Sequence, residues 1–299
     1  MKSWLSFFFI IILFVACSKK DQQENIENKS ETVMTDYQNV KIKPLPMAVQ
    51  CWTFRKFTFF ETLQKVKDLG IKYLEAYPGQ ALSSNTPDVQ LDHNLSDEQL
   101  QMMRNKLNEM GITLVNYGVV DLGKDEANMI KVFNFAKKMG ITTIITEPEF
   151  DDFSLIEKLV QQYNIKIAIH NHPTPSRYAL PQTVLEHVKG LDKRIGSCAD
   201  TGHWLRSGVV PVKALRLLKG RIISTHLKDL NEFGVKEAYD VPFGLGAANI
   251  HDILAELTLQ KYQGYLVIEY ENEAEVMNPS PSILKGLEYI KSIADFGEK

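Results

Sequence analysis

Residues 195–204 read Ile-Gly-Ser-Cys-Ala-Asp-Thr-Gly-His-Trp, an apolar run that ends in Asp200, with His203 three residues later. Four other apolar runs also end in ionisable side chains. They end in Glu147, in the pair His170 and His172, in His226 and in Glu269. Because the carboxyl ends of parallel strands meet at one face of an α/β protein, we expect these side chains to form one site.

The segments around this stretch predict the fold. From Pro46 onward, short β-rich runs alternate with helical patterns; the expected strands are residues 47–52, 71–76, 112–119, 141–146, 165–169, 195–199, 221–225 and 264–268. Helix ends are marked by signals such as the capping box Ser96-Asp-Glu-Gln99 and the terminating Gly111. Apolar, non-alternating strands covered by helices indicate a parallel sheet, and eight of them close a (β/α)8 TIM barrel, an α/β fold. A doubly wound open sheet is the alternative. Residues 78–94 are expected to be a long loop.

The first 43 residues predict export. After Met-Lys-Ser, the chain is apolar from Trp4 to Ala16, which is too short to span a bilayer. Residues 1–16 are therefore interpreted as a signal peptide. The boundary Leu13-Phe-Val-Ala-Cys17 resembles a bacterial lipoprotein signal, in which Cys17 is lipidated; a plain secretory signal is the alternative. Residues 17–43 are polar and predict a disordered tether, and residues 44–299 the barrel. We expect an exported lipoprotein, held on the periplasmic or cell-surface side by its lipid anchor alone.

Composition excludes some classes of protein. With 299 residues, 44% of them hydrophobic, the chain can bury one large core. A formal net charge of −3 supplies no basic field, which argues against a nucleic-acid partner. The three cysteines, Cys17, Cys51 and Cys198, are odd in number and widely scattered, so neither a disulfide framework nor a thiolate zinc site is indicated.

The expected site gathers three carboxylates and two imidazoles from strands four to eight: Glu147, His170, Asp200, His226 and Glu269. So much confined negative charge is costly unless a cation neutralises it, which predicts a divalent metal ion. Oxygen and nitrogen ligands suit manganese, cobalt, zinc, nickel or iron more than calcium, and magnesium also belongs to the expected set. Such an ion polarises a sugar carbonyl and acidifies the adjacent C–H group, so that a carboxylate can take the proton. Glu147 and Glu269 are the expected acid/base pair.

Other side chains around the mouth are expected to contact the substrate. These are His170, His172, His203 and Lys228. For Lys228, the alternative is a structural ion pair with Asp229. For the carboxylate at the end of strand four, the alternative to Glu147 is Glu149. Glu271 and Glu273 are expected to be solvated. Five aromatic residues near strand ends can either stack on a sugar ring or pack in the core: Trp52, Phe54, Tyr77, Tyr117 and Trp204.

Three motifs carry a family resemblance: Asp200-Thr-Gly-His203, Thr225-His-Leu-Lys228 and Val267-Ile-Glu269. They resemble motifs of the xylose isomerase-like TIM barrel superfamily of sugar (phosphate) isomerases and epimerases, which includes endonuclease IV. The resemblance implies that Asp200, His226 and Glu269 bind metal and that His203 contacts substrate. Where the family usually has a metal-binding glutamate on strand five, this chain has His170. Glu147, one strand earlier, is expected to restore that carboxylate as the fourth metal ligand.

These observations support three hypotheses. The first is a metal-dependent isomerase or epimerase of an unphosphorylated sugar or keto sugar. The substrate is expected to lack a phosphate group because no glycine-rich phosphate cradle or basic cluster is visible in the sequence. The alternative is a lyase or dehydratase that acts on 3-keto sugars or 3-keto-glycosides through the same enolate. The third is a carbohydrate-binding lipoprotein without catalysis. Endonuclease activity would require more histidines and a basic DNA-binding face.

Overall fold

The structure is a computed structural model that describes residues 36–123 and 125–294. The predicted signal peptide, Cys17 and the tether up to residue 35 lie outside the described residues. Export and lipidation therefore stay predictions. Among the described residues, no helix has the length and apolar character needed to cross a membrane.

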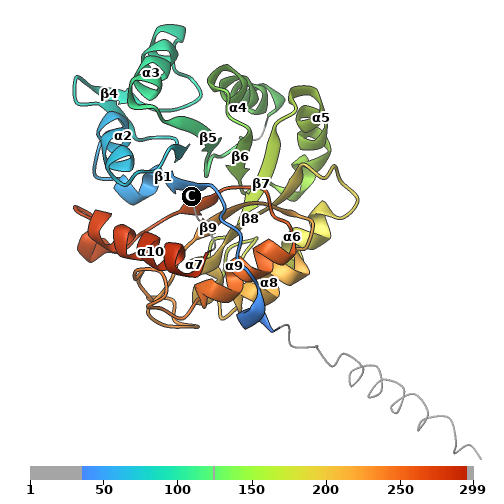
Figure 1. Ribbon diagram of the computed structural model, residues 1–299. Helices are drawn as coiled ribbons and strands as arrows, with labels where there is room; N and C mark the ends of the chain where they lie inside the picture. The colour runs from blue at the N-terminus through green and yellow to red at the C-terminus, as the bar shows by residue number, and fades with distance from the viewer. Residues whose placement is uncertain (1–35, 124, 295–299) are drawn as a thin grey trace, which may run out of the picture. The chain divides into compact units, whose positions relative to one another are not determined.

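Eight parallel strands close into a barrel (Figure 1). In chain order they are β1 (Met47–Gln50), β2 (Tyr73–Ala76), β5 (Thr113–Tyr117), β6 (Thr143–Thr146), β7 (Lys166–His170), β8 (Ile195–Asp200), β9 (Ile222–Leu227) and β10 (Leu266–Ile268). The ring is closed by parallel pairing of β1 with β10, in which Met47 lies opposite Leu266. The predicted TIM barrel is confirmed.

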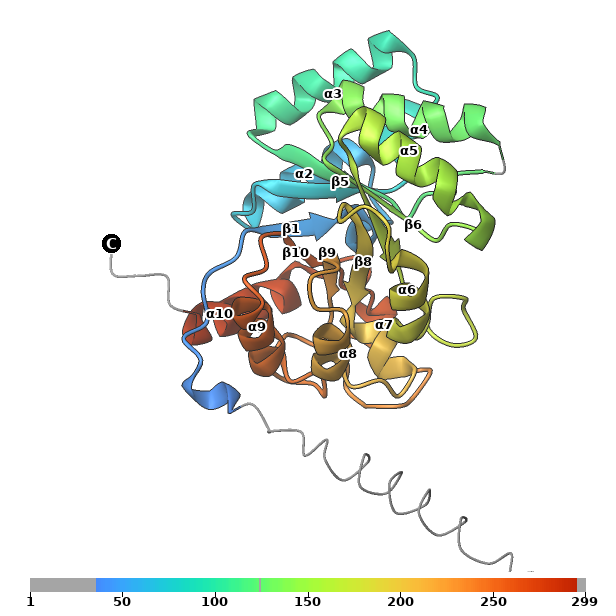
Figure 2. The same ribbon diagram turned by 90° about the vertical axis from the view of Figure 1, so that its right-hand side faces the viewer.

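Helices surround the strands on all sides in Figure 1, and Figure 2 shows the same barrel from the side. They are α2 (Phe59–Asp68), α3 (Asp97–Met110), α4 (Glu126–Met139), α5 (Phe153–Tyr163), α6 (Pro181–Val188), α7 (Thr201–Arg206), α8 (Pro211–Leu217), α9 (Ile250–Leu259) and α10 (Ser280–Ile293). Local sequence sets their ends: Ser96 and Gln99 form the expected capping box of α3, and Gly111 ends that helix in a left-handed conformation.

The strand faces that point into the barrel position the site. Ala48, Val115 and Val267 pack together inside it, and Ile145, Ala168 and Cys198 form a second interior group. Side chains alternate along a strand, so the residue two positions further on shares the same face, nearer the mouth. At the carboxyl ends of β7, β8 and β10 those next interior positions are His170, Asp200 and Glu269, the last of which directly follows β10. The apolar interior therefore forms the floor under a ring of polar side chains.

Two elements were not expected from the sequence. The segment expected as a loop contains an antiparallel hairpin of β3 (Ala81–Ser83) and β4 (Thr86–Gln90), which lies beside α2 and α3 in Figure 1. The short helix α7 follows β8 directly, because the Asp200 carboxylate accepts a hydrogen bond from the His203 N–H and caps the helix start.

The packed unit also begins earlier than residue 44. Tyr37, in the short helix η1 (Tyr37–Asn39), is buried and donates its hydroxyl proton to Glu256 of α9. Ile42 is buried and pairs with Ala294. The predicted tether thus includes a described portion that packs on the barrel, because it contributes one aromatic and one aliphatic side chain to the core.

Candidate metal centre and active site

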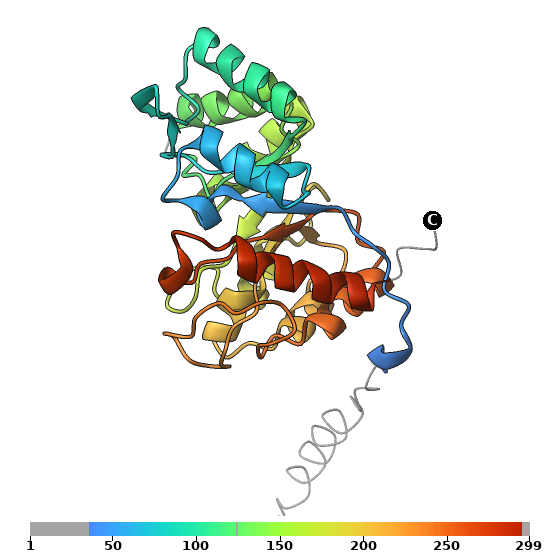
Figure 3. The same ribbon diagram turned by 60° about the vertical axis from the view of Figure 1, so that its left-hand side comes forward.

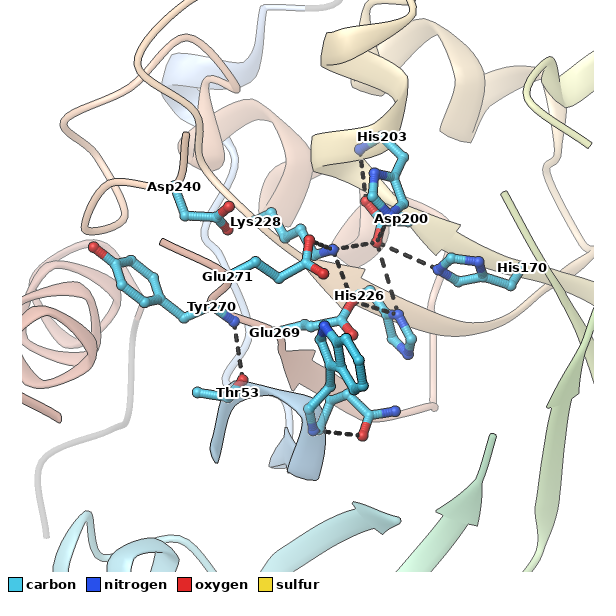
Figure 4. A network of polar contacts seen from close by, with 12 residues as sticks. Thr53, His170, Asp200, His203, His226, Lys228, Asp240, Glu269, Tyr270 and Glu271 are labelled. Atoms are coloured by element: carbon cyan, nitrogen blue, oxygen red, sulfur yellow. Dashed lines mark hydrogen bonds and ion pairs between the residues drawn. The ribbon is translucent and has the colours of Figure 1, made fainter. Parts of the chain in front are cut away.

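Four buried side chains from four strands meet at the carboxyl end of the barrel (Figure 4). His170, Asp200, His226 and Glu269 each offer one ligand atom, and these atoms all lie within 4.8 Å of one another. His170 Nε2 lies 3.5 Å from Asp200 Oδ2. His226 Nδ1 lies 3.7 Å from the same oxygen and 3.0 Å from Glu269 Oε2. Three of the four predicted metal ligands, Asp200, His226 and Glu269, are therefore brought together.

The donor atoms of this group fit a metal ion. His170 Nε2, Asp200 Oδ2 and His226 Nδ1 are buried, and none makes a hydrogen bond of good geometry among the described residues, although Asp200 Oδ2 lies 3.0 Å from Lys228 Nζ and His226 Nδ1 lies 3.0 Å from Glu269 Oε2. Buried polar atoms are normally hydrogen-bonded, so three atoms that face one another without such a bond fit a ligand at that point. Two imidazole nitrogens and two carboxylates suit a divalent transition metal.

Carboxylates behind the two histidines orient them. His226 Nε2 lies 2.6 Å from Glu75 Oε1, and His170 Nδ1 lies 3.0 Å from Glu147 Oε1. Each imidazole therefore points its other nitrogen toward the centre, as metal-binding histidines usually do. Glu75 is fully buried and accepts further hydrogen bonds from Gln50 Nε2 at 2.7 Å and Asn116 Nδ2 at 2.8 Å.

The structure places Glu147 beside His170, the last residue of β7, and His172 in the following loop, and outside the central group. Its Oε1 lies 2.5 Å from His172 Nδ1, in addition to His170, and its Oε2 accepts a hydrogen bond from Ser176 at 3.2 Å. Burial opposes its ionisation, but the two imidazoles outweigh burial and lower the pKa of Glu147. Glu149, the alternative candidate, is exposed and pairs with Arg177 at 2.5 Å.

Lys228, which was expected to contact the substrate, lies buried among carboxylates. Its fully buried Nζ is 3.0 Å from Asp200 Oδ2, 2.8 Å from Glu269 Oε2 and 2.5 Å from Glu271 Oε2. Burial disfavours the ammonium ion, yet the surrounding carboxylates hold the pKa of Lys228 well above its ordinary value. Asp229 does not form an ion pair with it: its carboxylate accepts backbone N–H groups from Gly244, Gly246 and Ala248 and shapes the loop before α9.

His203 lies at the rim of the centre, with Nε2 3.7 Å from Asp200 Oδ2. Its Nδ1 is 3.1 Å from Nη1 of Arg206. A guanidinium group only donates, so Nδ1 accepts and the ring proton is on Nε2. Burial keeps the pKa of His203 well below its usual range.

A cavity of about 350 Å³ opens above the centre. Its walls include Trp52, Tyr77, His172, His203 and Glu269. Trp52 is 40% exposed and meets Tyr77 edge to face at 5.1 Å, so these two rings provide an apolar wall. The other aromatic candidates, Phe54, Tyr117 and Trp204, are buried in the core.

Two carboxylates in the site were missed or misjudged from the sequence. Glu75 has no histidine neighbour in sequence; its only signal was a charged residue inside the apolar strand Tyr73-Leu-Glu-Ala76. Glu271 was expected to be solvated but contacts Lys228 and lines the cavity. Glu273 is 77% exposed, as expected.

Comparison with known proteins agrees with this architecture. A sequence profile of the family described as xylose isomerase-like TIM barrel matches residues 63–293. An inosose dehydratase of Bacillus thuringiensis (strain Al Hakam) is 27% identical over 220 residues, which cover 66% of this chain and 70% of that protein.

Two solved structures share the fold. A protein of uncharacterised function from Parabacteroides distasonis is 33% identical, with a TM-score of 0.67, and the match covers 83% of this chain and 98% of that one. The 3-keto-D-glucoside 4-epimerase YcjR from E. coli is 14% identical, with a TM-score of 0.63 and coverage of 83% and 100%.

Proposed function

Since the chain belongs to the xylose isomerase-like TIM barrel family, we propose that it is a divalent-metal-dependent enzyme that removes a proton next to the carbonyl group of an unphosphorylated keto sugar. The observation that carries this proposal is the convergence of four buried ligand atoms below an open cavity. In this proposal His170 joins Asp200, His226 and Glu269 as a metal ligand. Glu147, the fourth ligand expected from the sequence, instead orients His170.

When bound, a divalent ion supplies Lewis acidity, which polarises a carbonyl oxygen and acidifies the neighbouring C–H group. Glu269 is the proposed base, because it lines the cavity and is ionised at neutral pH. Burial opposes that charge, but Lys228 and His226 outweigh it and lower the pKa of Glu269. His203 is proposed to bind a substrate oxygen through its Nε2–H group.

Isomerisation or epimerisation requires a second group that returns the proton. The sequence assigns this role to Glu147, which does not line the cavity, whereas His172 does. Because His172 Nδ1 contacts Glu147, its Nε2 is the atom left available on the cavity side. We propose that Glu147 acts through His172, which gives the two faces of the substrate different acid/base groups.

Elimination is the second candidate function. It is favoured by the inosose dehydratase relative, which covers 66% of this chain. The same proton removal by Glu269 would start this reaction, and the imidazole of His172 or His203 would protonate the leaving oxygen. A binding protein without catalysis is disfavoured by the complete set of convergent ligand atoms.

The test is solvent deuterium exchange into a panel of free keto sugars and 3-keto-glycosides, followed by NMR, with metal-loaded protein. Deuterium retained on a rearranged, intact sugar establishes isomerase or epimerase activity. Loss of water or of the aglycone establishes elimination. The variant Glu269→Gln is expected to lose exchange and turnover while it keeps its fold. Absence of exchange with every candidate in the panel would contradict the enzyme proposal.

A further inference from the structure

The face opposite the mouth carries a regular set of exposed lysines. Six of the eight barrel strands have at least one exposed lysine at their start or in the preceding loop, and we take the one nearest the strand: Lys43 for β1, Lys72 for β2, Lys166 for β7, Lys193 for β8, Lys219 for β9 and Lys261 for β10. The amino ends of parallel strands all lie at the face opposite the mouth. In the barrel these six strands are consecutive, in the order β2-β1-β10-β9-β8-β7. We call this set the basal lysine arc.

Hollows connect members of the arc. Lys166, Lys193 and Lys261 line one hollow of about 320 Å³. Lys261 also lines the next, of about 410 Å³, together with Lys43. Lys72 lines a third hollow with Lys291. The lysines therefore surround recessed surface that can admit small anionic groups.

The arc lysines are not paired with carboxylates of the described residues. None of the six lysines forms an ion pair with any residue in the ranges 36–123 and 125–294. Asp192, the carboxylate next to Lys193, is already paired with Arg194 at 2.6 Å. The formal net charge of the whole chain is −3, so a basic face reflects segregation of charge.

Helix dipoles account for only part of the arc, since Lys219 and Lys261 directly follow the C-caps of α8 and α9. Cations are favoured in the last turn of a helix, which explains Lys65 and Lys67 in α2. Lys72, Lys166 and Lys193 lie outside the helices. Their exposure on one face therefore calls for a different explanation.

The chain joins the barrel at this same face. The Lys43 N–H group donates to Thr258 at the end of α9 at 3.2 Å, and Figure 3 shows η1 on the side from which β1 starts. Nineteen residues separate Cys17 from Tyr37. A lipid on Cys17 would keep this face within about 70 Å of the bilayer even with those residues fully extended.

We propose that the basal lysine arc docks on an anionic membrane surface, with lysines contacting phosphate groups of the lipids. Docking on this face directs the cavity away from the membrane, toward soluble substrate. The proposal does not depend on the reaction catalysed, because no arc lysine lines the cavity.

The experiment compares the full chain with two triple variants in flotation with vesicles. Partitioning is measured into vesicles of phosphatidylcholine alone and into vesicles with about one third phosphatidylglycerol. The ratio of the two partition coefficients cancels any binding by the N-terminal segment that does not depend on lipid charge. The arc variant is Lys166→Gln/Lys193→Gln/Lys261→Gln. The matched control is Lys131→Gln/Lys213→Gln/Lys285→Gln, which removes three exposed lysines from the sequences of α4, α8 and α10.

The parent is expected to prefer anionic vesicles at 50 mM NaCl and to lose the preference at 500 mM. The arc variant should lower the ratio by about a hundredfold, and the control by far less. Both variants should keep the parental melting temperature and turnover. Equal loss in the two variants, or no anionic preference in the parent, would overturn the proposal. Release by inorganic phosphate at matched ionic strength would also overturn it, since that result indicates a free-anion site.

Discussion

At the scale of single residues, the histidine ligands depend on carboxylates that lie behind them. Glu75 contacts His226 Nε2 at 2.6 Å and so leaves Nδ1 to face the centre. We expect Glu75→Gln to weaken metal binding by about 10- to 100-fold, because the amide is a weaker acceptor and does not enforce the ring orientation. Isothermal titration with zinc and manganese measures this change.

Glu149→Gln is the matched control for Glu75→Gln. It makes the same chemical change at an exposed residue that pairs with Arg177 outside the centre, so its metal affinity should equal that of the parent. Parental affinity in Glu75→Gln would show that this carboxylate does not support the metal centre.

Asp240 links the site to pH. It is 1% exposed, and its Oδ2 lies 3.3 Å from Arg206 Nη2. Burial raises the pKa of Asp240 to about 7, with a further contribution from Glu271, while Lys228 and Arg206 oppose the shift. The folded protein therefore holds a proton there that the unfolded chain loses near pH 4. The contribution of Asp240 to the free energy of unfolding therefore falls as pH rises from about 4 to 7.

Asp240→Asn removes this titration. Relative to the parent, the variant should gain stability between pH 5 and pH 7, on the order of 2 kcal/mol. Urea unfolding at several pH values measures the difference, with the exposed site Asp88→Asn on β4 as the control. A constant difference between parent and variant across this pH range would contradict the assignment.

At the scale of elements, the sequence predicted all eight strands and the residues at the ends of five of them. Periodicity and helix stops define each element locally, which is why predicted and observed bounds agree closely, as for the strand expected over 195–199 and observed over Ile195–Asp200. Local sequence does not determine how far each side chain reaches across the barrel. His170 rather than Glu147 therefore joins the central group, and Glu75, from the opposite part of the ring, supports His226. The hairpin β3–β4 was missed because it has few apolar positions.

The end of β5 packs tightly against β6 at Gly118. A Cβ atom there would lie 2.2 Å from the Ile145 carbonyl oxygen and 2.6 Å from Ile145 Cβ. The Gly118 carbonyl also accepts a hydrogen bond from Gln50 Nε2 at 2.8 Å. Gly118→Ala should therefore destabilise the protein by about 1–3 kcal/mol and raise KM, since Gly118 lines the cavity.

Gly111→Ala provides the comparison for Gly118→Ala. Gly111 has a φ of +68° but no atom within 4 Å of an added Cβ, so only backbone strain applies, about 1 kcal/mol. Its KM should be unchanged, because Gly111 lies at the far end of the strand from the mouth. Thermal unfolding and steady-state kinetics of the two variants test this. A normal KM in Gly118→Ala would show that the added methyl group does not disturb the cavity wall.

At the scale of the whole molecule, two charge systems lie at opposite ends of one barrel. At the mouth, carboxylates cluster around Lys228 and the candidate metal centre. At the base, exposed lysines lie at or before the starts of six strands that are neighbours in the barrel. The barrel core between them is apolar, with Ala48, Val115 and Val267 at its centre. A change at one face should therefore leave the other intact, which allows the proposed catalysis and the proposed membrane docking to be tested separately.

Metal removal tests how much the candidate metal centre contributes to the stability of the whole protein. Without a metal ion, the buried ligand atoms of His170, Asp200 and His226 make no hydrogen bond of good geometry among the described residues, and Lys228 is the cation beside the carboxylates of Asp200 and Glu269. A metal that binds only the folded protein stabilises it by about 2.7 kcal/mol at a free concentration of 100 times Kd. For a chain of this size, that should raise Tm by roughly 4–5 °C. Chelation should reverse the increase, and Glu269→Gln should lose most of it, whereas Glu273→Gln, on the exposed side of the same loop, should respond like the parent. An equal Tm with and without each divalent metal would show that the cluster holds none, and it would leave Lys228 as the cation that balances these carboxylates.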